Sequence, residues 1–143
     1  MNLFFDASAL VKRYLSEPGS ATVARLVRAR GAVVVSDVSR VEVRAAVWRR
    51  VRARDVPEAD ARRALSRFEE DFRQVSVIEA RRIVLETAST LVELHPLRAY
   101  DAIQLASALT YARRTRRALT FVSADAELNS AARSEGLRVA RVG

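Results

Sequence analysis

The sequence predicts a single α/β domain over residues 1–143, a three-layer α/β/α sandwich around a five-stranded parallel sheet. Five short apolar runs alternate with seven stretches of helical periodicity, and strands that alternate with helices imply crossover connections between parallel strands. The apolar runs are continuous and do not alternate with polar residues, as is typical of strands covered on both faces. Both observations favour a sheet between two helical layers.

The expected elements follow one another along the chain without a linker. The strands are expected at residues 3–5, 32–35, 75–78, 119–122 and 137–142. The helices are expected at residues 8–15, 20–30, 37–54, 57–72, 79–94, 99–113 and 124–134. Ser8 and Asp37 suit helix starts, Pro57 suits a first helical turn, and Gly31 and Gly136 suit helix ends before strands.

Composition narrows the class of protein. Half of the 143 residues are apolar and only 4 are Gly and 3 are Pro, so we expect a compact folded domain. The chain has no cysteine, which excludes disulfides and thiolate metal sites. Its start does not resemble a signal peptide, and no uncharged apolar run approaches the roughly 20 residues that span a bilayer. We therefore expect a cytoplasmic protein with no membrane partner.

The charge balance favours a polyanionic partner. The chain carries 25 Lys and Arg against 17 Asp and Glu, a net charge of +8, which is typical of nucleic-acid binding. Two arginine-rich stretches, residues 49–54 and 113–117, could track an RNA backbone or could be solvated helix ends. Because Lys12 is the only lysine, part of this charge could also reflect a compositional preference for arginine.

Two acids follow expected strands. Asp6 comes directly after the first strand, and Asp125 follows the fourth in the stretch ALTFVSAD. In a parallel sheet, both carboxylates emerge at the edge where ligands bind. Each also has a structural interpretation, since Asp6 suits a turn and Asp125 suits the cap of the helix that follows it.

Two further acids lie in apolar surroundings. The neighbours of Glu42 three and four residues away in its helix are small or apolar, so Glu42 is expected on an apolar face. Asp101 is the only charged residue in the run 99–112 and is expected to be buried. A dipole or capping role in the first turn is the alternative for Asp101.

Electrostatics connects the four acids to a metal. Two carboxylates about 5 Å apart repel by roughly 3 kcal/mol at an effective dielectric constant near 20. If the four acids share a pocket, protonation or bound cations must therefore reduce this repulsion. Oxygen ligands without His or Cys suit Mg²⁺ or Mn²⁺ better than zinc. The sequence therefore predicts a divalent-metal site formed by Asp6, Glu42, Asp101 and Asp125.

Four stretches of the chain resemble the acidic motifs of PIN domain ribonucleases, and within that family those of VapC-type toxins from bacterial toxin-antitoxin pairs. The stretches are FFDASALVKRY, VSDVSRVEVRAAVWRR, LRAYDAIQLASAL and FVSADAELNSAARSEGLRV. They occur in order over nearly the whole chain. Carried over residue by residue, the acids of the family fall on Asp6, Glu42, Asp101 and Asp125.

The resemblance also implies a sheet order and supporting residues. The family order 3-2-1-4-5 places the first and fourth strands side by side, which would bring Asp6 and Asp125 together. Ser8 and Ser123 match positions of small hydroxyl residues, and Ser123 is expected to orient a carboxylate from outside the ligand set. Glu127 is left out of the predicted set, although some relatives carry an acid near this position.

What the resemblance implies about activity is metal-assisted hydrolysis of RNA by an endoribonuclease toxin. One or two Mg²⁺ or Mn²⁺ ions would activate water for in-line attack without a covalent intermediate. The resemblance further implies a structured RNA substrate, such as transfer RNA, a homodimer, and inhibition by a cognate VapB-like antitoxin. Lys12 and Arg13 lie near Asp6 in the sequence and are the expected RNA contacts.

Two other protein classes with an acid after the first strand fit the sequence less well. Phosphatases with an aspartate nucleophile need a second acid two residues on, where this chain has Ser8. Receiver-type signalling domains need adjacent acids near the first strand and a late lysine, whereas Asp6 has no acidic neighbour and the one lysine is Lys12. The alternative that stays open is a catalytically silent PIN-like module that binds RNA or protein.

Overall fold

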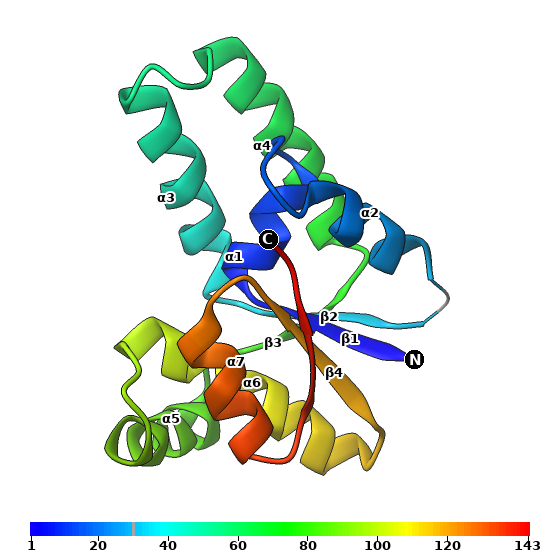
Figure 1. Cartoon of the computed structure of the whole chain (residues 1–143), viewed down its shortest axis with the longest axis vertical. Coiled ribbons are helices and arrows are strands. Elements are labelled where there is room, and N and C mark those ends of the chain that lie inside the picture. Colours follow the sequence, from blue (N-terminus) through cyan, green and yellow to red (C-terminus); the bar gives the residue numbers. More distant parts are fainter. Residues whose placement is uncertain (30) are drawn as a thin grey trace.

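The computed structural model describes residues 1–29 and 31–143, and these residues contain one five-stranded sheet (Figure 1). The strands are β1 (Asn2–Phe5), β2 (Val33–Ser36), β3 (Ser76–Ile78), β4 (Leu119–Ser123) and β5 (Arg138–Arg141). All neighbouring pairs are parallel, and the order is β3-β2-β1-β4-β5. The predicted fold class and sheet order are confirmed.

Helices cover both faces of the sheet. The helices are α1 (Ala7–Leu10), a 3-10 turn η1 (Val11–Arg13), α2 (Ser20–Arg28), α3 (Ser39–Arg52), α4 (Glu58–Phe72), α5 (Arg82–Leu94), α6 (Ala99–Thr115) and α7 (Ala126–Ser134). Leu3 and Phe5 pack in a core with α1 to α4, whereas Phe4 packs with α5, α6 and α7. This alternation explains why β1 is apolar from Leu3 to Phe5, since successive side chains of a strand point to opposite faces.

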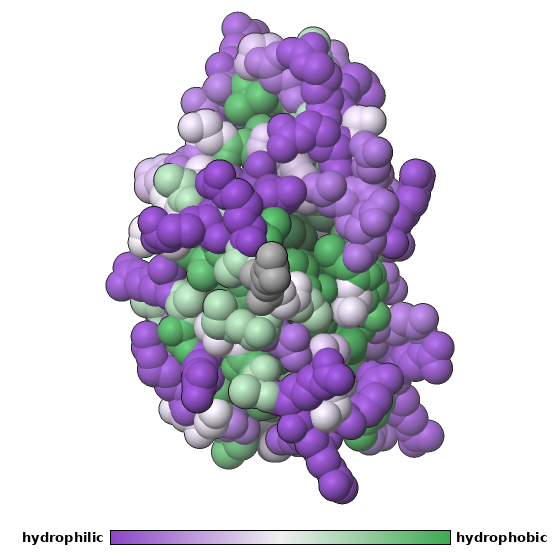
Figure 2. Space-filling model, turned by 90° about the vertical axis from the view of Figure 1, so that its right-hand side faces the viewer, coloured by the Kyte–Doolittle hydropathy of each residue, from purple (hydrophilic) through white to green (hydrophobic). Residues whose placement is uncertain are grey.

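The two helical layers differ in shape. Figure 1 shows α3 and α4 as a hairpin that extends away from the sheet, whereas α5, α6 and α7 lie against the other face. Figure 2 views the side where the amino-terminal ends of the strands lie, and apolar side chains gather in the middle of that side. The opposite side, where the strands end, holds the predicted acids.

The strand register brings two strand ends together. Phe5 of β1 lies opposite Val122 of β4, and the Asp6 amide donates to the Val122 carbonyl at 3.1 Å. The chain leaves both strands at the same edge of the sheet, so the residues that follow β1 and β4 are neighbours. This edge is where ligands bind in open α/β sheets.

Several element boundaries differ from the predicted ones. The first helix is capped by Asp6, whose Oδ1 accepts from the Ala9 amide at 2.9 Å, so Ser8 lies inside it. The α3 helix starts at Ser39, after a turn at Asp37. The predicted helix 20–30 ends at Arg28, and Arg30 lies outside the described residues. No helix in residues 1–29 or 31–143 is both long and apolar enough to cross a membrane.

Candidate active site

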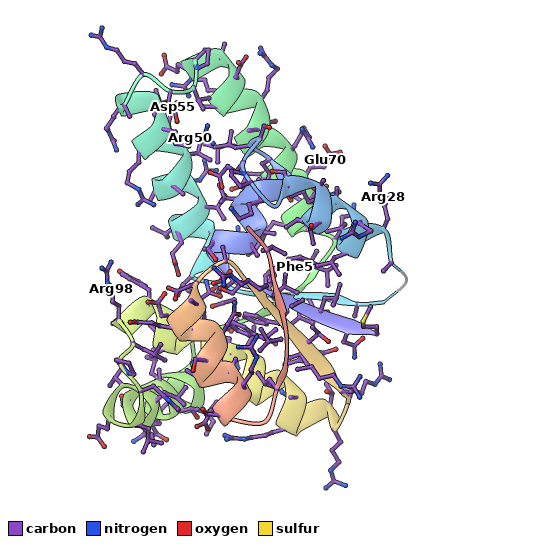
Figure 3. The ribbon with its side chains drawn as sticks, viewed as in Figure 1. Phe5, Arg28, Arg50, Asp55, Glu70 and Arg98 are labelled. Carbon is purple, nitrogen blue, oxygen red and sulfur yellow. The ribbon has the colours of Figure 1, made fainter. Side chains whose placement is uncertain are left out.

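Asp6 is buried directly beneath the end of the sheet. Figure 3 shows the preceding residue, Phe5, well inside the molecule, and Asp6 itself is only 3% exposed. The Ser123 hydroxyl lies 2.6 Å from Asp6 Oδ2, and the Ser8 hydroxyl lies 2.7 Å from Oδ1 and 3.0 Å from Oδ2. The Ala9 amide supplies a third donor. All three donors hold the carboxylate in one orientation.

Backbone amides fix the direction in which both serine hydroxyls donate. The Ala124 amide donates to Ser8 Oγ at 3.0 Å, and the Asp125 amide donates to Ser123 Oγ at 3.0 Å. With an oxygen lone pair of each serine occupied in this way, the hydroxyl protons are available to Asp6. The hydrogen bonds that the sequence predicted from these serines are therefore present, and they favour the ionised form of Asp6.

Burial acts in the opposite direction on Asp6. Removal from water raises the pKa of Asp6 from 3.8 to about 6, because the hydrogen bonds from Ser123, Ala9 and Ser8 offset only part of the desolvation. The negative charge of Glu42 adds to this increase. No positively charged side chain in the described part of the chain is among the causes that shift the pKa of Asp6, and a cation bound beside it would restore its ionised form.

Glu42 projects from the first turn of α3 and is held by a residue that sequence analysis missed. Gln104 of α6 is 1% exposed, and its Nε2 donates to Glu42 Oε1 at 3.1 Å and to Ser39 Oγ at 3.0 Å. Burial raises the pKa of Glu42, and the charge of Asp101 raises it further. The sequence signal for Gln104 was a long polar side chain in an apolar run, one helical turn after Asp101.

Asp101 lies in the first turn of α6 and is only partly buried. The expected burial of Asp101 is only partial, because its side chain lines an open pocket. Burial raises the pKa of Asp101, and the charges of Asp125 and Glu127 raise it further. A hydrogen bond from the Arg98 backbone lowers it, so the capping interpretation of Asp101 also applies.

Asp125 has a structural role and a place in the site at the same time. It is the N-cap of α7, and its Oδ1 accepts from the Leu128 amide at 3.1 Å. Asp125 also lines the same pocket as Glu42 and Asp101. The cap and the site, which sequence analysis treated as alternatives, occur together.

The pocket lies between α3, the segment leading into α6, and the start of α7, and its volume is about 750 Å³. Its acids are Glu42, Asp101, Asp125 and Glu127. Asp6 is buried outside the lining, within reach of the charge of Glu42. The other lining residues are Val41, Ala45, Arg49, Pro96, Leu97, Arg98 and Tyr100. Glu127, which the sequence prediction left out, is thus part of the pocket wall.

The donor set fits a hydrated divalent cation better than a closed cage. The acids offer carboxylate oxygens as ligands, which Mg²⁺ and Mn²⁺ prefer. Burial or neighbouring charge raises the pKa of three of these acids. Within the described residues, however, no three acids are arranged to hold one ion. Mg²⁺ in proteins usually keeps several waters and takes only one or two carboxylates, and the pocket meets this requirement.

The expected RNA contacts Lys12 and Arg13 lie outside the pocket. Lys12 Nζ lies 3.3 Å from Glu17 Oε1, and its side chain is only 10% exposed. Arg13 Nε lies 3.3 Å from Asp71 Oδ2. Their contact with RNA stays a prediction, to which this geometry adds no support.

Comparisons with known proteins agree with the architecture. The family model of the PIN domain matches residues 3–134. Ribonuclease VapC45 of Mycobacterium tuberculosis (strain CDC 1551 / Oshkosh) is 33% identical over 138 residues, which cover 96% of this chain and 94% of that protein. Ribonuclease VapC49 of strain ATCC 25618 / H37Rv of that species matches with the same identity and coverage.

A solved structure of VapC20 from M. tuberculosis, described as a sarcin-ricin loop cleaving toxin, has a TM-score of 0.69 at 18% identity and covers 97% of this chain and 98% of its own. The structure of VapBC2 from Rickettsia felis, bound to a promoter DNA fragment, has a TM-score of 0.68 at 12% identity, with both chains fully covered. At these identities the two structures support the fold alone.

Proposed function

Because the chain belongs to the PIN domain family, in its VapC-type group, we propose that it is a metal-dependent endoribonuclease toxin that hydrolyses RNA phosphodiester bonds. One observation carries the proposal. Asp6, Glu42, Asp101 and Asp125 come from four separate segments of the chain. Three of them line one pocket, and the fourth, Asp6, is buried close enough to it that the charge of Glu42 raises its pKa. Carboxylates that lie close together repel one another and do not stabilise the folded protein. Their clustering at this edge of the sheet therefore favours a role in binding or catalysis.

Asp6, Glu42, Asp101 and Asp125 would hold Mg²⁺ or Mn²⁺ in this pocket. When bound, such an ion lowers the pKa of water and neutralises charge on a phosphate. The protein supplies orientation: Ser8 and Ser123 fix the carboxylate of Asp6, and Gln104 fixes that of Glu42. Glu42, Asp101 and Asp125 are half-buried and line the pocket, whereas Asp6 is buried, so the first three are the acids that an incoming phosphate and its water would meet.

The test is RNA cleavage by the purified protein with Mg²⁺ or Mn²⁺, compared with the same reaction in EDTA. We expect cleavage with either metal and none with the chelator. Asp101→Asn should abolish cleavage, whereas Glu93→Gln, a change at an exposed acid on α5, should leave it intact. Equal cleavage with and without EDTA would refute the metal dependence, and RNA binding without cleavage would favour the silent binding module.

We also propose a VapB-like antitoxin as the protein partner and a homodimer as the assembly. Assemblies named VapBC among the structural relatives support the first. Apolar side chains exposed on α5, namely Ile83, Leu85, Val92 and Leu94, support a protein contact on that helix. Light scattering of the isolated protein tests the homodimer, and co-purification with the product of the neighbouring gene tests the antitoxin.

A further inference from the structure

We propose that Arg49 and Arg98 bind RNA phosphates next to the one that faces the acids, and that Tyr100 stacks on an unpaired base. This inference rests on the proposed function, because it describes how the same pocket holds its substrate. It reassigns the RNA contacts from Lys12 and Arg13, which lie outside the pocket.

Arg49 lies on the side of α3 that faces the pocket. Val41, Glu42, Ala45 and Arg49 all line the pocket, and the seven steps along the helix from Glu42 to Arg49 span about 10 Å between their backbones. A phosphate at Arg49 is therefore separate from one at the acids.

Arg49 differs from the next arginine on α3, Arg50, in its ion pairs. Arg50 is held by Glu17 at 3.1 Å and Asp55 at 3.0 Å, and Figure 3 shows Arg50 and Asp55 in the upper part of the α3–α4 hairpin. Arg49 takes part in none of the ion pairs within 4.0 Å in the described part of the chain. Its guanidinium therefore remains available for an anion.

Arg98 is the corresponding cation on the opposite wall of the pocket. It precedes the first turn of α6, is exposed and lines the pocket. Figure 3 shows its side chain extending outward from this point. In residues 1–29 and 31–143, Arg98 also has no ion-pair partner within 4.0 Å. The charges of Arg49 and Arg98 reach the acids, since they lower the pKa of Glu42 and of Asp101 respectively.

The pocket also exposes apolar surface from both walls. Tyr100 on α6 is 60% exposed and Val41 on α3 is 68% exposed, and both line the pocket. An exposed aromatic ring next to phosphate-binding arginines is a common means of holding single-stranded nucleic acid, because every base has a face that stacks. Tyr100 lies in the same helical turn as Asp101, so a base stacked there belongs to a nucleotide next to the phosphate at the acids.

The balance of charge explains why the pocket needs these arginines. Four acids and two arginines line the pocket, and the carboxylate of Asp6 is buried near Glu42. Without a bound cation, this excess of negative charge repels phosphate. The guanidinium group binds phosphate oxygens with two parallel hydrogen bonds, and it keeps its charge at any pH at which the protein is folded.

The experiment measures RNA affinity against salt concentration at one fixed Mg²⁺ concentration in an Asp101→Asn background, with a short fluorescent single-stranded RNA of mixed sequence. The variants are Arg49→Gln, Arg98→Gln, Tyr100→Ala and the conservative changes Arg49→Lys and Tyr100→Phe. The matched control is Arg138→Gln, which makes the same charge change at an exposed residue that begins β5, at the end of the sheet away from the pocket. Circular dichroism confirms that each variant is folded.

We expect Arg49→Gln and Arg98→Gln each to reduce the slope of log affinity against log salt by about 0.7, the value for one phosphate contact on a single strand. Arg49→Lys and Arg138→Gln should keep the slope. Tyr100→Ala should weaken binding roughly five- to hundredfold at constant slope, and Tyr100→Phe should restore it.

Unchanged slopes for both Gln variants, or an equal reduction in Arg138→Gln, would overturn the assignment of the arginines, and an unchanged affinity in Tyr100→Ala would overturn the stacking. These outcomes are independent of the proposed reaction. If the protein cleaves RNA with Mg²⁺ but the slopes do not change, only this inference fails. If the slopes change but no cleavage occurs with metal, the inference stands and the proposed reaction fails.

Discussion

The stability of the metal-free protein should fall as the pH rises from 4 to 7, and Asp6 should be the main cause. In the folded protein the pKa of Asp6 is about 6, against an ordinary value of 3.8. Between these values, folded Asp6 holds a proton that the unfolded chain has released. The free energy of unfolding therefore decreases with pH across this interval, since the folded state binds more protons.

The magnitude follows from the two pKa values. At 1.36 kcal/mol for each unit of pH, the interval from 3.8 to about 6 corresponds to about 3 kcal/mol of stability from Asp6, which is present below pH 3.8 and lost above pH 6. Burial of the 3%-exposed side chain is the largest cause of the raised pKa. About 3 kcal/mol is a large part of the 5–15 kcal/mol typical of a domain.

The assay is urea unfolding at pH 4, 5, 6 and 7.5 in EDTA, for the native chain and for Asp6→Asn. Asp6→Asn should lose about 3 kcal/mol of the pH dependence, because its side chain does not titrate, whereas the exposed control Glu93→Gln should keep the native profile. Adding Mg²⁺ at pH 7.5 should stabilise the native chain more than Asp6→Asn, since a ligand that binds only the folded state adds to stability. Matching pH profiles for the native chain and Asp6→Asn would refute the electrostatic account of Asp6.

Three further substitutions test the supporting residues. Ser123→Ala removes the charge-assisted hydrogen bond that the Ser123 hydroxyl donates to Asp6, and it should lower the free energy of unfolding at pH 7.5 by about 2 kcal/mol. The measurement is urea unfolding, with Ser130→Ala at an exposed serine of α7 as the control. Gln104→Leu should slow RNA cleavage by about tenfold, yet cost less than about 1 kcal/mol of stability, because it also removes a buried amide oxygen that has no partner among the described residues. Gly136→Ala should destabilise the protein by about 1 kcal/mol in the same urea assay, since Gly136 has a φ of +89° at the end of α7.

Most of the fold could be predicted because it depends on local patterns. Continuous apolar runs predicted strands buried on both faces, and each of the five strands overlaps the predicted run. The errors are at helix starts, where side-chain caps decide the boundary. Asp6, two residues before the predicted start, caps α1, and α3 begins two residues after Asp37, because the turn at residues 37 and 38 follows β2 directly.

The acids of the site could be predicted, but their partners could not. A charged residue in an apolar run is visible in the sequence, and this is how Glu42 and Asp101 were found. Gln104 supports Glu42 from 62 positions away, and Arg49 and Arg98 reach the pocket from two different walls. Such contacts depend on how α3 and α6 are placed in the fold, and sequence spacing within one helix does not report them. Lys12 shows the same limit, since it is close to Asp6 in the sequence and yet is not among the residues that line the pocket.

Asp125 allows the structural and chemical roles of one carboxylate to be separated. Its Oδ1 caps α7 through the Leu128 amide, and its negative charge contributes to the pocket beside Asp101. Asn caps helices about as well as Asp, whereas Ala costs about 1 kcal/mol at this position. Asp125→Asn should therefore keep the free energy of unfolding within about 0.5 kcal/mol while cleavage is lost, and Asp125→Ala should lose both. Urea unfolding and RNA cleavage, measured on the same preparations, distinguish the two roles. If Asp125→Asn cleaves RNA at the native rate, the carboxylate serves only the helix, and the charge that the pocket needs must come from Glu127.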